Sequence, residues 1–160
     1  MALLVRHVMT EEPKAARPDM TAADAAGLMR TFDVGAIPLV EDDRLVGLVT
    51  DRDLVVRALA HRADPAQVRL GEIATTATVT ISPDAQLSEA RDLMAERRVR
   101  RLPVTKDGRL VGMVSLGDIA LADASPRAVG ETLRVVSESG STRSLNEGPD
   151  RGTPDRVREG

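Results

Sequence analysis

The apolar and polar positions of this chain follow one pattern that occurs twice, at a step of 65 residues. Each copy has a short first strand, then apolar residues at the i, i+3, i+7 spacing of an amphipathic helix. Two apolar stretches joined by a two-residue turn follow, and a second helix closes the copy. The pattern predicts strand, helix, strand, strand and helix twice: 14–17, 21–33, 37–41, 44–50 and 51–60, and then 78–82, 86–98, 102–106, 109–115 and 116–122.

The two copies align without a gap from Val8/Ile73 to Leu59/Ala124, and 15 of the 52 aligned pairs are identical. Identities fall on apolar, turn and acidic positions alike, as two copies of one supersecondary unit require. Two copies are too few for a solenoid, so we expect a face-to-face pair related by a two-fold-like axis. The apolar face of the first predicted helix is formed by Ala22, Ala25, Met29 and Phe32.

A short polar connector links the copies, so we expect the two halves to pack directly on each other. After the second copy, the stretch from Pro126 to Ser137 has apolar residues on one side and predicts one more helix. The chain beyond it is poor in apolar residues and is expected to be disordered. The predicted units are repeat 1 over 4–60, a linker and lead-in over 61–72, repeat 2 over 73–124, a C-terminal helix over 125–138 and a tail over 139–160.

The composition excludes several classes of function. The chain has 42% hydrophobic residues but only one Phe and no Trp or Tyr, so the core is aliphatic and the chain lacks the aromatic platforms that stack single-stranded nucleic acid. A formal net charge of −3 gives no basic footprint for DNA. Cysteine is absent, which rules out disulfides and thiolate metal sites and suits a reducing compartment. No signal peptide or membrane-spanning stretch is evident, and we expect a cytoplasmic protein.

A short motif, Gly-h-h-[Thr/Ser]-x-x-Asp (h, hydrophobic), ends the last strand of each copy and begins its closing helix. Thr50 and Ser115 are placed as helix N-caps, and Asp53 and Asp118 three residues later complete capping boxes. Capping alone explains all four residues. A functional role adds to it, because a hydroxyl and free amide groups at a cleft suit a phosphate, and a nearby carboxylate accepts both hydroxyls of a ribose.

The strand-Pro-strand-Gly-h-h-[Thr/Ser]-x-x-Asp pattern, doubled at this spacing over residues 4–124, resembles a pair of CBS domains, or Bateman module. The chain is especially similar to small stand-alone CBS proteins of the hypoxic-response type. The resemblance implies an α+β fold in which two βαββα units pack through their sheets with pseudo-two-fold symmetry and form two clefts. It also implies a homodimeric disc and an adenosyl ligand: AMP, ADP, ATP or S-adenosylmethionine.

Carried over to this chain, the family pattern assigns the ribose to Asp53 and Asp118, and the hydroxyls beside ribose and phosphate to Thr50 and Ser115. The backbone that contacts the base is expected near Ala15, Thr80, Ile37 and Leu102.

Four arginines in five residues precede Pro103. They either form a solvated helix end that complements the helix dipole or reach the ligand's phosphate with their planar guanidinium groups. The residues at phosphate-reaching places are Arg98, Arg100 and Arg101, whereas the first copy has Asp33, Gly35 and Ala36 there. We therefore expect unequal clefts, with phosphate favoured where the arginines of the second copy point.

No motif of a catalytic site is present, and Asp51 and Asp53 do not share a helix face, so we expect no enzyme activity and no cofactor. His7 and His61 have no metal-ligating partner at helical spacing, and no metal site is predicted. The expected function is regulatory: an adenosyl ligand is sensed and the signal passes through an unidentified protein partner or a change of assembly. Two alternatives stay open, a structural or stress-response dimer without a ligand, and a metal-binding module that uses the histidines with carboxylates.

Overall fold

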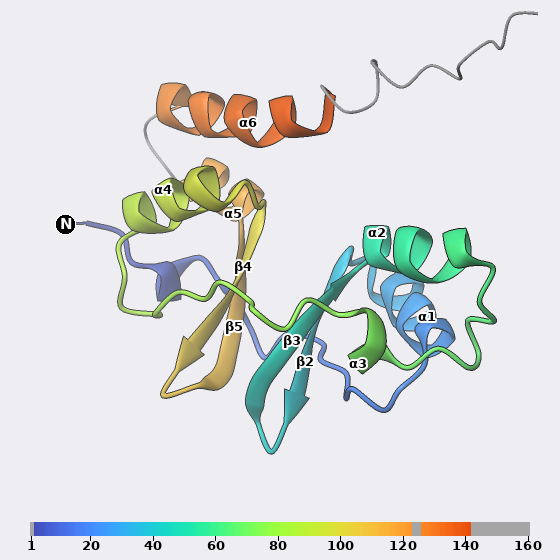
Figure 1. Cartoon of the computed structure of the whole chain (residues 1–160). Coiled ribbons are helices and arrows are strands. Elements are labelled where there is room, and N and C mark those ends of the chain that lie inside the picture. The colour runs from blue at the N-terminus through green and yellow to red at the C-terminus, as the bar shows by residue number, and fades with distance from the viewer. Residues whose placement is uncertain (1, 123–125, 142–160) are drawn as a thin grey trace, which may run out of the picture.

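The computed structural model describes residues 2–122 and 126–141, which form two similar halves and a C-terminal helix (Figure 1). The first half contains α1 (Ala22–Phe32), β2 (Ala36–Glu41), β3 (Arg44–Thr50) and α2 (Asp51–Asp53), which continues as η2 (Leu54–Ala58) and η3 (Leu59–His61). The second half contains α4 (Leu87–Arg97), β4 (Arg101–Lys106), β5 (Arg109–Ser115) and α5 (Leu116–Ala122). The remaining elements are η1 (Val5–His7), β1 (Thr10–Glu11), α3 (Leu70–Ile73) and α6 (Pro126–Ser141).

The two hairpins are built alike, as their shared sequence pattern predicts. Their turns have positive φ at both central positions, 49° and 64° at Asp42 and Asp43 and 53° and 77° at Asp107 and Gly108. These are the angles of the two-residue turn whose twist matches that of the strands. The register shifts after Leu39 in the first hairpin and after the corresponding Val104 in the second.

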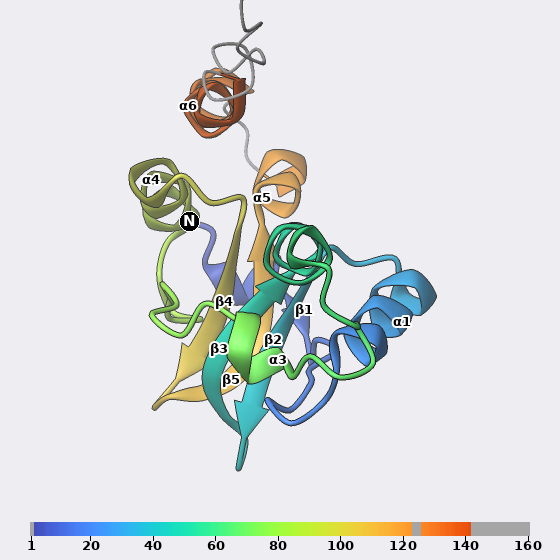
Figure 2. The same cartoon turned by 45° about the vertical axis from the view of Figure 1, so that its right-hand side comes forward.

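One sheet joins the halves through the strand order β1-β5-β3-β2, with β4 on β5, and Figure 2 shows the two hairpins side by side. The pairing follows the two-fold-like relation of the repeat. Thr10 pairs with Met113 across the halves, and Thr75, which is 65 residues after Thr10, pairs with Leu48. The predicted α+β fold, with two units packed through their sheets, is confirmed.

The core of each half includes a short segment that, in the sequence, comes just before the other half. Val5 is fully buried in the core of the second half, and its amide donates a hydrogen bond of 2.9 Å to the Ala85 carbonyl. Leu70, at the matching position, is fully buried in the core of the first half, and its amide donates a bond of 2.8 Å to the Met20 carbonyl. We call residues 3–11 and 68–76 the lead segments. They are exchanged between the halves.

The first strand predicted for each copy is wrong in its extent, because only one residue of each forms a ladder pair. Ala16 bridges Leu39, and Ile81 bridges Val104, both in the parallel sense. A proline two residues after each bridge, Pro18 or Pro83, has no amide hydrogen to continue a ladder.

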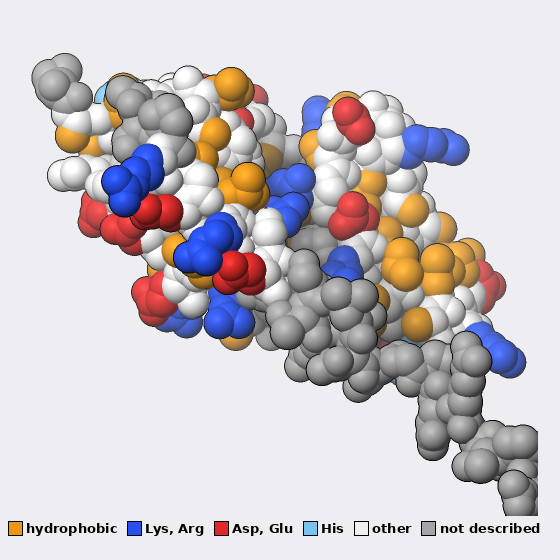
Figure 3. Space-filling view, turned by 90° about the horizontal axis from the view of Figure 1, so that it is seen from above, with side chains coloured by type: hydrophobic (Ala, Val, Ile, Leu, Met, Phe, Trp, Pro, Cys, Tyr) orange, Lys and Arg blue, Asp and Glu red, His pale blue; other side chains and the backbone are white. Residues whose placement is uncertain are grey.

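The helix α6 covers the outer helices of the second half. It lies on α4 and α5 in both views (Figures 1 and 2), and it buries Thr132 and Val136. The corresponding surface of the first half, over α1 and the helix that begins with α2, keeps Val55, Val56 and Leu59 exposed. Figure 3 shows hydrophobic side chains gathered on this half. The helix predicted from Pro126 extends to Ser141, and the rest of the predicted tail lies outside the described residues.

Candidate functional site

The motif residues form the same hydrogen-bonded box in both halves. Thr50 Oγ1 accepts a bond of 3.2 Å from the Asp53 amide, and Asp53 Oδ2 accepts one of 2.8 Å from the Thr50 amide. The Ser115 hydroxyl accepts one of 3.1 Å from the Asp118 amide, while the Ser115 amide and hydroxyl donate bonds of 2.8 and 2.7 Å to Asp118 Oδ2. Both carboxylates are therefore held at the first turn of the closing helix, and the capping interpretation of the motif is confirmed.

The two carboxylates differ in what lies one turn further along the helix. Asp53 Oδ1 is 3.6 Å from the Arg57 guanidinium, and the Asp53 side chain is only 15% exposed. The position equivalent to Arg57 is Ala122 in the second half, so Asp118 has no cation at i+4. The hydrogen bonds to Asp118 use Oδ2, and its carboxylate remains half-buried.

A cleft of about 510 Å³ lies where the halves meet, and Asp118 is part of its wall. Its volume is within the range of small-molecule sites. The second half contributes Arg101, Met113, Val114, Ser115 and Asp118, and the lead segment paired with it contributes Thr10. The first half contributes Glu12, Pro13, Lys14, Phe32, Asp33, Val34, Gly35 and Ala36. Residues from both halves thus converge on one cavity.

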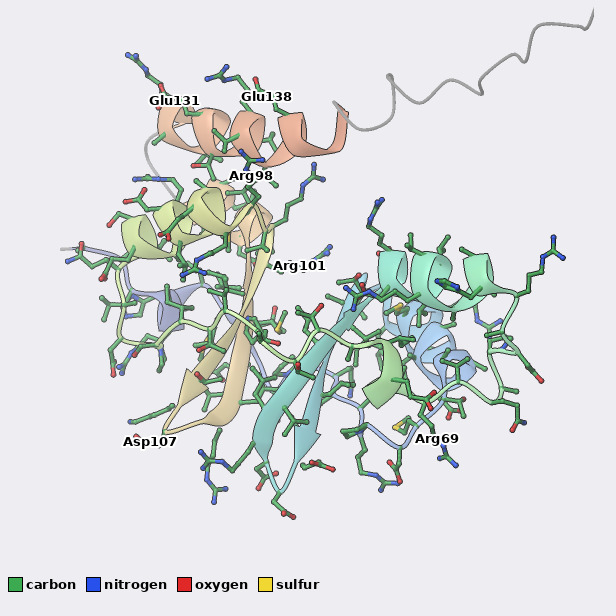
Figure 4. The ribbon with its side chains drawn as sticks, in the orientation of Figure 1. Arg69, Arg98, Arg101, Asp107, Glu131 and Glu138 are labelled. Atoms are coloured by element: carbon green, nitrogen blue, oxygen red, sulfur yellow. The ribbon has the colours of Figure 1, made fainter. Side chains whose placement is uncertain are left out.

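The three arginines proposed for phosphate recognition separate in the structure. Arg101 lines the cleft and reaches the first half beside Gly35, where a Cβ atom would lie 3.4 Å from Arg101 Nη1. Arg100 turns toward the C-terminal helix and donates a bond of 3.1 Å to the Ser137 hydroxyl. Arg98 ends α4 in a left-handed conformation and lies beside α6, whereas Arg101 lies lower, toward the gap between the halves (Figure 4).

None of the four predicted base-contacting residues lines the cleft itself, but two of them, Ala15 and Ile37, are next in sequence to residues that do. Ile37 and Leu102 are fully buried in the two cores. Ala15 is exposed and directly follows Lys14, which lines the cleft, as Ala36 before Ile37 also does. Thr80 lines a separate hollow of about 140 Å³. The cleft that contains Ser115 and Asp118 of the second motif is therefore completed by residues of the first half, including the neighbours of Ala15 and Ile37.

Most of the residues that line the cleft were not predicted as site residues, among them the charged or aromatic Glu12, Lys14, Phe32 and Asp33. Phe32 was placed on the apolar face of its helix, but it is 43% exposed, because α1 ends there and Asp33 turns the chain away with φ of 51°. Lys14 was assigned to a weak strand, and its ammonium group lies 4.6 Å from the centroid of the Phe32 ring. The family resemblance that placed the ligand's base near Ala15 could also have pointed to its neighbour Lys14 as a site residue.

No group of three or more metal-ligating side chains of the His, Asp or Glu type exists among residues 2–122 and 126–141. His7 lies in η1, where its Nδ1 atom accepts a bond of 3.1 Å from the Leu4 amide. His61 ends η3 in the other half. Across the same ranges, no helix has the length and apolar character needed to cross a bilayer.

The family model of the CBS domain matches this chain twice, over residues 5–59 and 70–125. The CBS domain-containing protein YhcV of Bacillus subtilis is 38% identical over 133 residues, which are 83% of this chain and 94% of that protein. Hypoxic response protein 1 of Mycobacterium tuberculosis is 43% identical over 101 residues, 62% of this chain and 71% of that protein.

Solved structures of similar fold include two with bound molecules. Hypoxic Response Protein I with two coordinated zinc ions has a TM-score of 0.69 and 37% identity, and the match covers 76% of this chain and 99% of that one. The CBS domain pair of protein MJ0100, in complex with 5′-methylthioadenosine and S-adenosyl-L-methionine, has a TM-score of 0.69 and 25% identity, with 76% and 96% covered. The fold is thus the same as that of solved two-domain pairs.

Proposed function

Because the chain belongs to the CBS domain family and carries two copies of the domain, we propose that it is a non-catalytic regulatory module that binds an adenosyl ligand in the cleft between its halves. The observation that carries the proposal is the position of Asp118: a carboxylate held by a capping box on the wall of a cavity of about 510 Å³. In the ligand-bound protein, this carboxylate accepts hydrogen bonds from the ribose hydroxyls, beside the Ser115 hydroxyl.

The charges of the cleft suit a ligand that carries its own charged group. Arg101 and Lys14 supply cations for a phosphate or carboxylate, one from each half. Glu12 and Asp33 supply anions on the wall of the first half. AMP uses the cations alone, whereas S-adenosylmethionine, with an ammonium, a sulfonium and a carboxylate, uses both kinds. The structural neighbour that binds S-adenosyl-L-methionine supports including this ligand.

The test is calorimetric titration of the full chain with adenosine, AMP and S-adenosylmethionine, using a matched pair of variants. Asp118→Asn removes the charge that accepts the ribose hydroxyls, and Asp53→Asn removes the equivalent charge in the other half. Both variants weaken a capping box, which should lower the stability of each by about 1 kcal/mol. Asp53→Asn also removes the ion pair with Arg57, so the stability of each variant is measured beside its affinity. We expect Asp118→Asn to weaken adenosine binding at least about tenfold, because hydrogen bonds to a charged acceptor are strong. Asp53→Asn should have a smaller effect.

Absence of binding by the wild-type chain, or equal binding by Asp118→Asn, contradicts the proposal. Arg101→Ala separates phosphate recognition from nucleoside recognition. It should remove any preference for AMP over adenosine, while Arg98→Ala, whose side chain lies outside the cleft, should preserve that preference. Equal affinity of the wild-type chain for AMP and adenosine would show that the cleft does not use its cations for phosphate.

The output of such a module requires a surface that responds to the ligand, and we propose a homodimer for this purpose. Support comes from the exposed Val55, Val56 and Leu59 on the first half, since a contiguous apolar face of this kind marks an association surface. Light scattering after gel filtration measures the mass directly. Val56→Asp should give a monomer if this face pairs with itself, and an unchanged mass contradicts the assignment.

Metal binding is the second candidate function, favoured by the structural neighbour that holds two zinc ions. Thermal unfolding with zinc, with and without His7→Ala and His61→Ala, tests it. Ligand present at 100 times its dissociation constant adds about 2.7 kcal/mol to stability, which is easily measured. A zinc effect that the histidine variants abolish would favour this function over the adenosyl ligand. A chain stabilised by none of the probes would be left with the structural-dimer alternative.

A further inference from the structure

Phe32 is the only aromatic residue of the chain, and the structure places its ring in the cleft instead of a core. The side chain is 43% exposed, although the same chain builds both its cores from aliphatic residues alone. A large ring that is left partly open to solvent within a ligand-sized cavity has apolar surface available for a ligand. This surface and the carboxylate of Asp118 line the same cleft, and the two residues come from different halves.

The local structure explains why the ring is not needed for packing. The core beneath α1 is closed by Met29, which is buried, and the Val34 amide returns to the Met29 carbonyl with a bond of 3.1 Å. The left-handed conformation of Asp33 ends α1 directly after Phe32. The helix end therefore presents the ring to the cleft, and Val34 continues the same wall.

The second half has no ring at the equivalent position. The residue 65 positions after Phe32 is Arg97, which is exposed and lies 3.5 Å from the Glu96 carboxylate. The halves are therefore complementary at this cleft: the first supplies the ring and the second supplies Asp118 and Arg101. Lys14 covers the ring, with its ammonium group 4.6 Å from the ring centroid.

We propose that Phe32 stacks against the base of the ligand and so determines the preference of the cleft for a flat heterocycle, while Lys14 leaves the ring and turns to the anionic group of the same ligand. This inference rests on the proposed function, since it names the residues that recognise the base at that site. Stacking of a base on an aromatic ring is a strong and sequence-tolerant contact, and it exceeds an exposed cation–π contact. The exchange of Lys14 for a base is therefore favourable.

The absence of Trp and Tyr from the chain provides a direct assay. Phe32→Trp creates a single fluorophore in the cleft, and Arg97→Trp creates one at the matched position of the other half. We expect adenosine to quench the fluorescence of Phe32→Trp with the same midpoint that calorimetry gives, and to leave Arg97→Trp unchanged. Phe32→Leu keeps an apolar side chain but loses the ring, and it should bind adenosine about tenfold more weakly than wild type. Far-ultraviolet circular dichroism confirms that each variant is folded.

Lys14→Gln tests the second part of the proposal. The variant should weaken AMP several-fold more than adenosine, because only AMP offers a phosphate to the ammonium group. Equal losses for both ligands, or no loss for AMP, would overturn the role of Lys14.

The outcomes separate this inference from the function on which it rests. If the wild-type chain binds no adenosine by calorimetry, the proposed function fails and the role of Phe32 fails with it. If the wild-type chain binds adenosine, Phe32→Leu binds it equally well and Phe32→Trp shows no quenching, then the adenosyl site stands and the role of Phe32 is wrong. Quenching in Arg97→Trp with none in Phe32→Trp would place the base in the other half.

Discussion

The exchange of lead segments predicts that Val5 is energetically part of the second half, although it precedes the first half in the sequence. Val5 is fully buried among the core residues of the second half, and so is Val114 of β5. Val49 of β3, which is the same residue type at the equivalent position and is also fully buried, belongs to the other core. The substitutions Val5→Ala, Val114→Ala and Val49→Ala therefore form a matched set for double-mutant cycles.

Each valine-to-alanine change removes two buried methyl groups, which is about 1.6 kcal/mol at about 0.8 kcal/mol for each group. The cavity that remains raises the cost to about 2 kcal/mol. Two such changes cost about 4 kcal/mol, which a domain with an unfolding free energy of about 5–15 kcal/mol tolerates. The double variants should therefore remain folded and measurable.

Urea unfolding followed by circular dichroism gives the free energy of each variant. We expect Val5→Ala and Val49→Ala to add within about 0.5 kcal/mol, because they affect separate cores. Val5→Ala and Val114→Ala should depart from additivity by more than about 0.5 kcal/mol, since the cavities lie in one core. Coupling of Val5 with Val49, and additivity with Val114, would refute the exchange of lead segments.

Three further predictions concern the turn, the C-terminal helix and pH. Gly108→Ala should cost about 1 kcal/mol in urea unfolding, because φ at this turn residue is 77°; an unchanged midpoint would contradict the turn geometry. Val136→Ala, in the buried face of α6, should cost about 1 kcal/mol or more, whereas Leu133→Ala, at a site 47% exposed, should cost less; equal losses would argue against the docking of α6 on α4 and α5. Hydrogen bonds from the Thr21 amide and hydroxyl lower the pKa of Asp24. The stabilising effect of this carboxylate is therefore present above about pH 4 and is lost as the pH falls through the lowered pKa. Asp24→Asn should reduce the loss of unfolding free energy in acid, and an identical pH profile of that free energy would show that the cap does not contribute.

The repeat and the binary pattern were enough to predict the two helices and the hairpin of each repeat and their pairing into two related halves, but not the short helices η1 and α3 of the lead segments. Two-residue turns with Asp-Asp and Asp-Gly fixed the hairpin registers, because the required angles suit these residues. The capping boxes were also predictable, since they depend only on residues three positions apart. These features depend on residues that are close together in the chain, so they can be predicted without knowing the tertiary structure.

The exchange of lead segments and the composition of the cleft were not predictable in the same way. Val5 has the same apolar character whichever core it enters, and only three-dimensional contacts assign it to the second half: its bond to the Ala85 carbonyl and the pairing of Thr10 with Met113. Phe32 fits the apolar helix pattern, but the left-handed Asp33 ends the helix at that point. Arg100 and Arg101 are neighbours with the same chemistry, and the alternation of side chains at the start of β4 sends one to α6 and the other to the cleft.

The crossing of the lead segments has a consequence for how such a chain can originate. A polypeptide containing one repeat would have a core left open along the side that its own lead segment does not reach. Two identical molecules would close both cores by trading these segments, which makes the symmetric pair the smallest complete unit. Joining two such genes end to end yields one polypeptide with the contacts of that pair, and each copy is then free to diverge, as Phe32 and Arg97 have done.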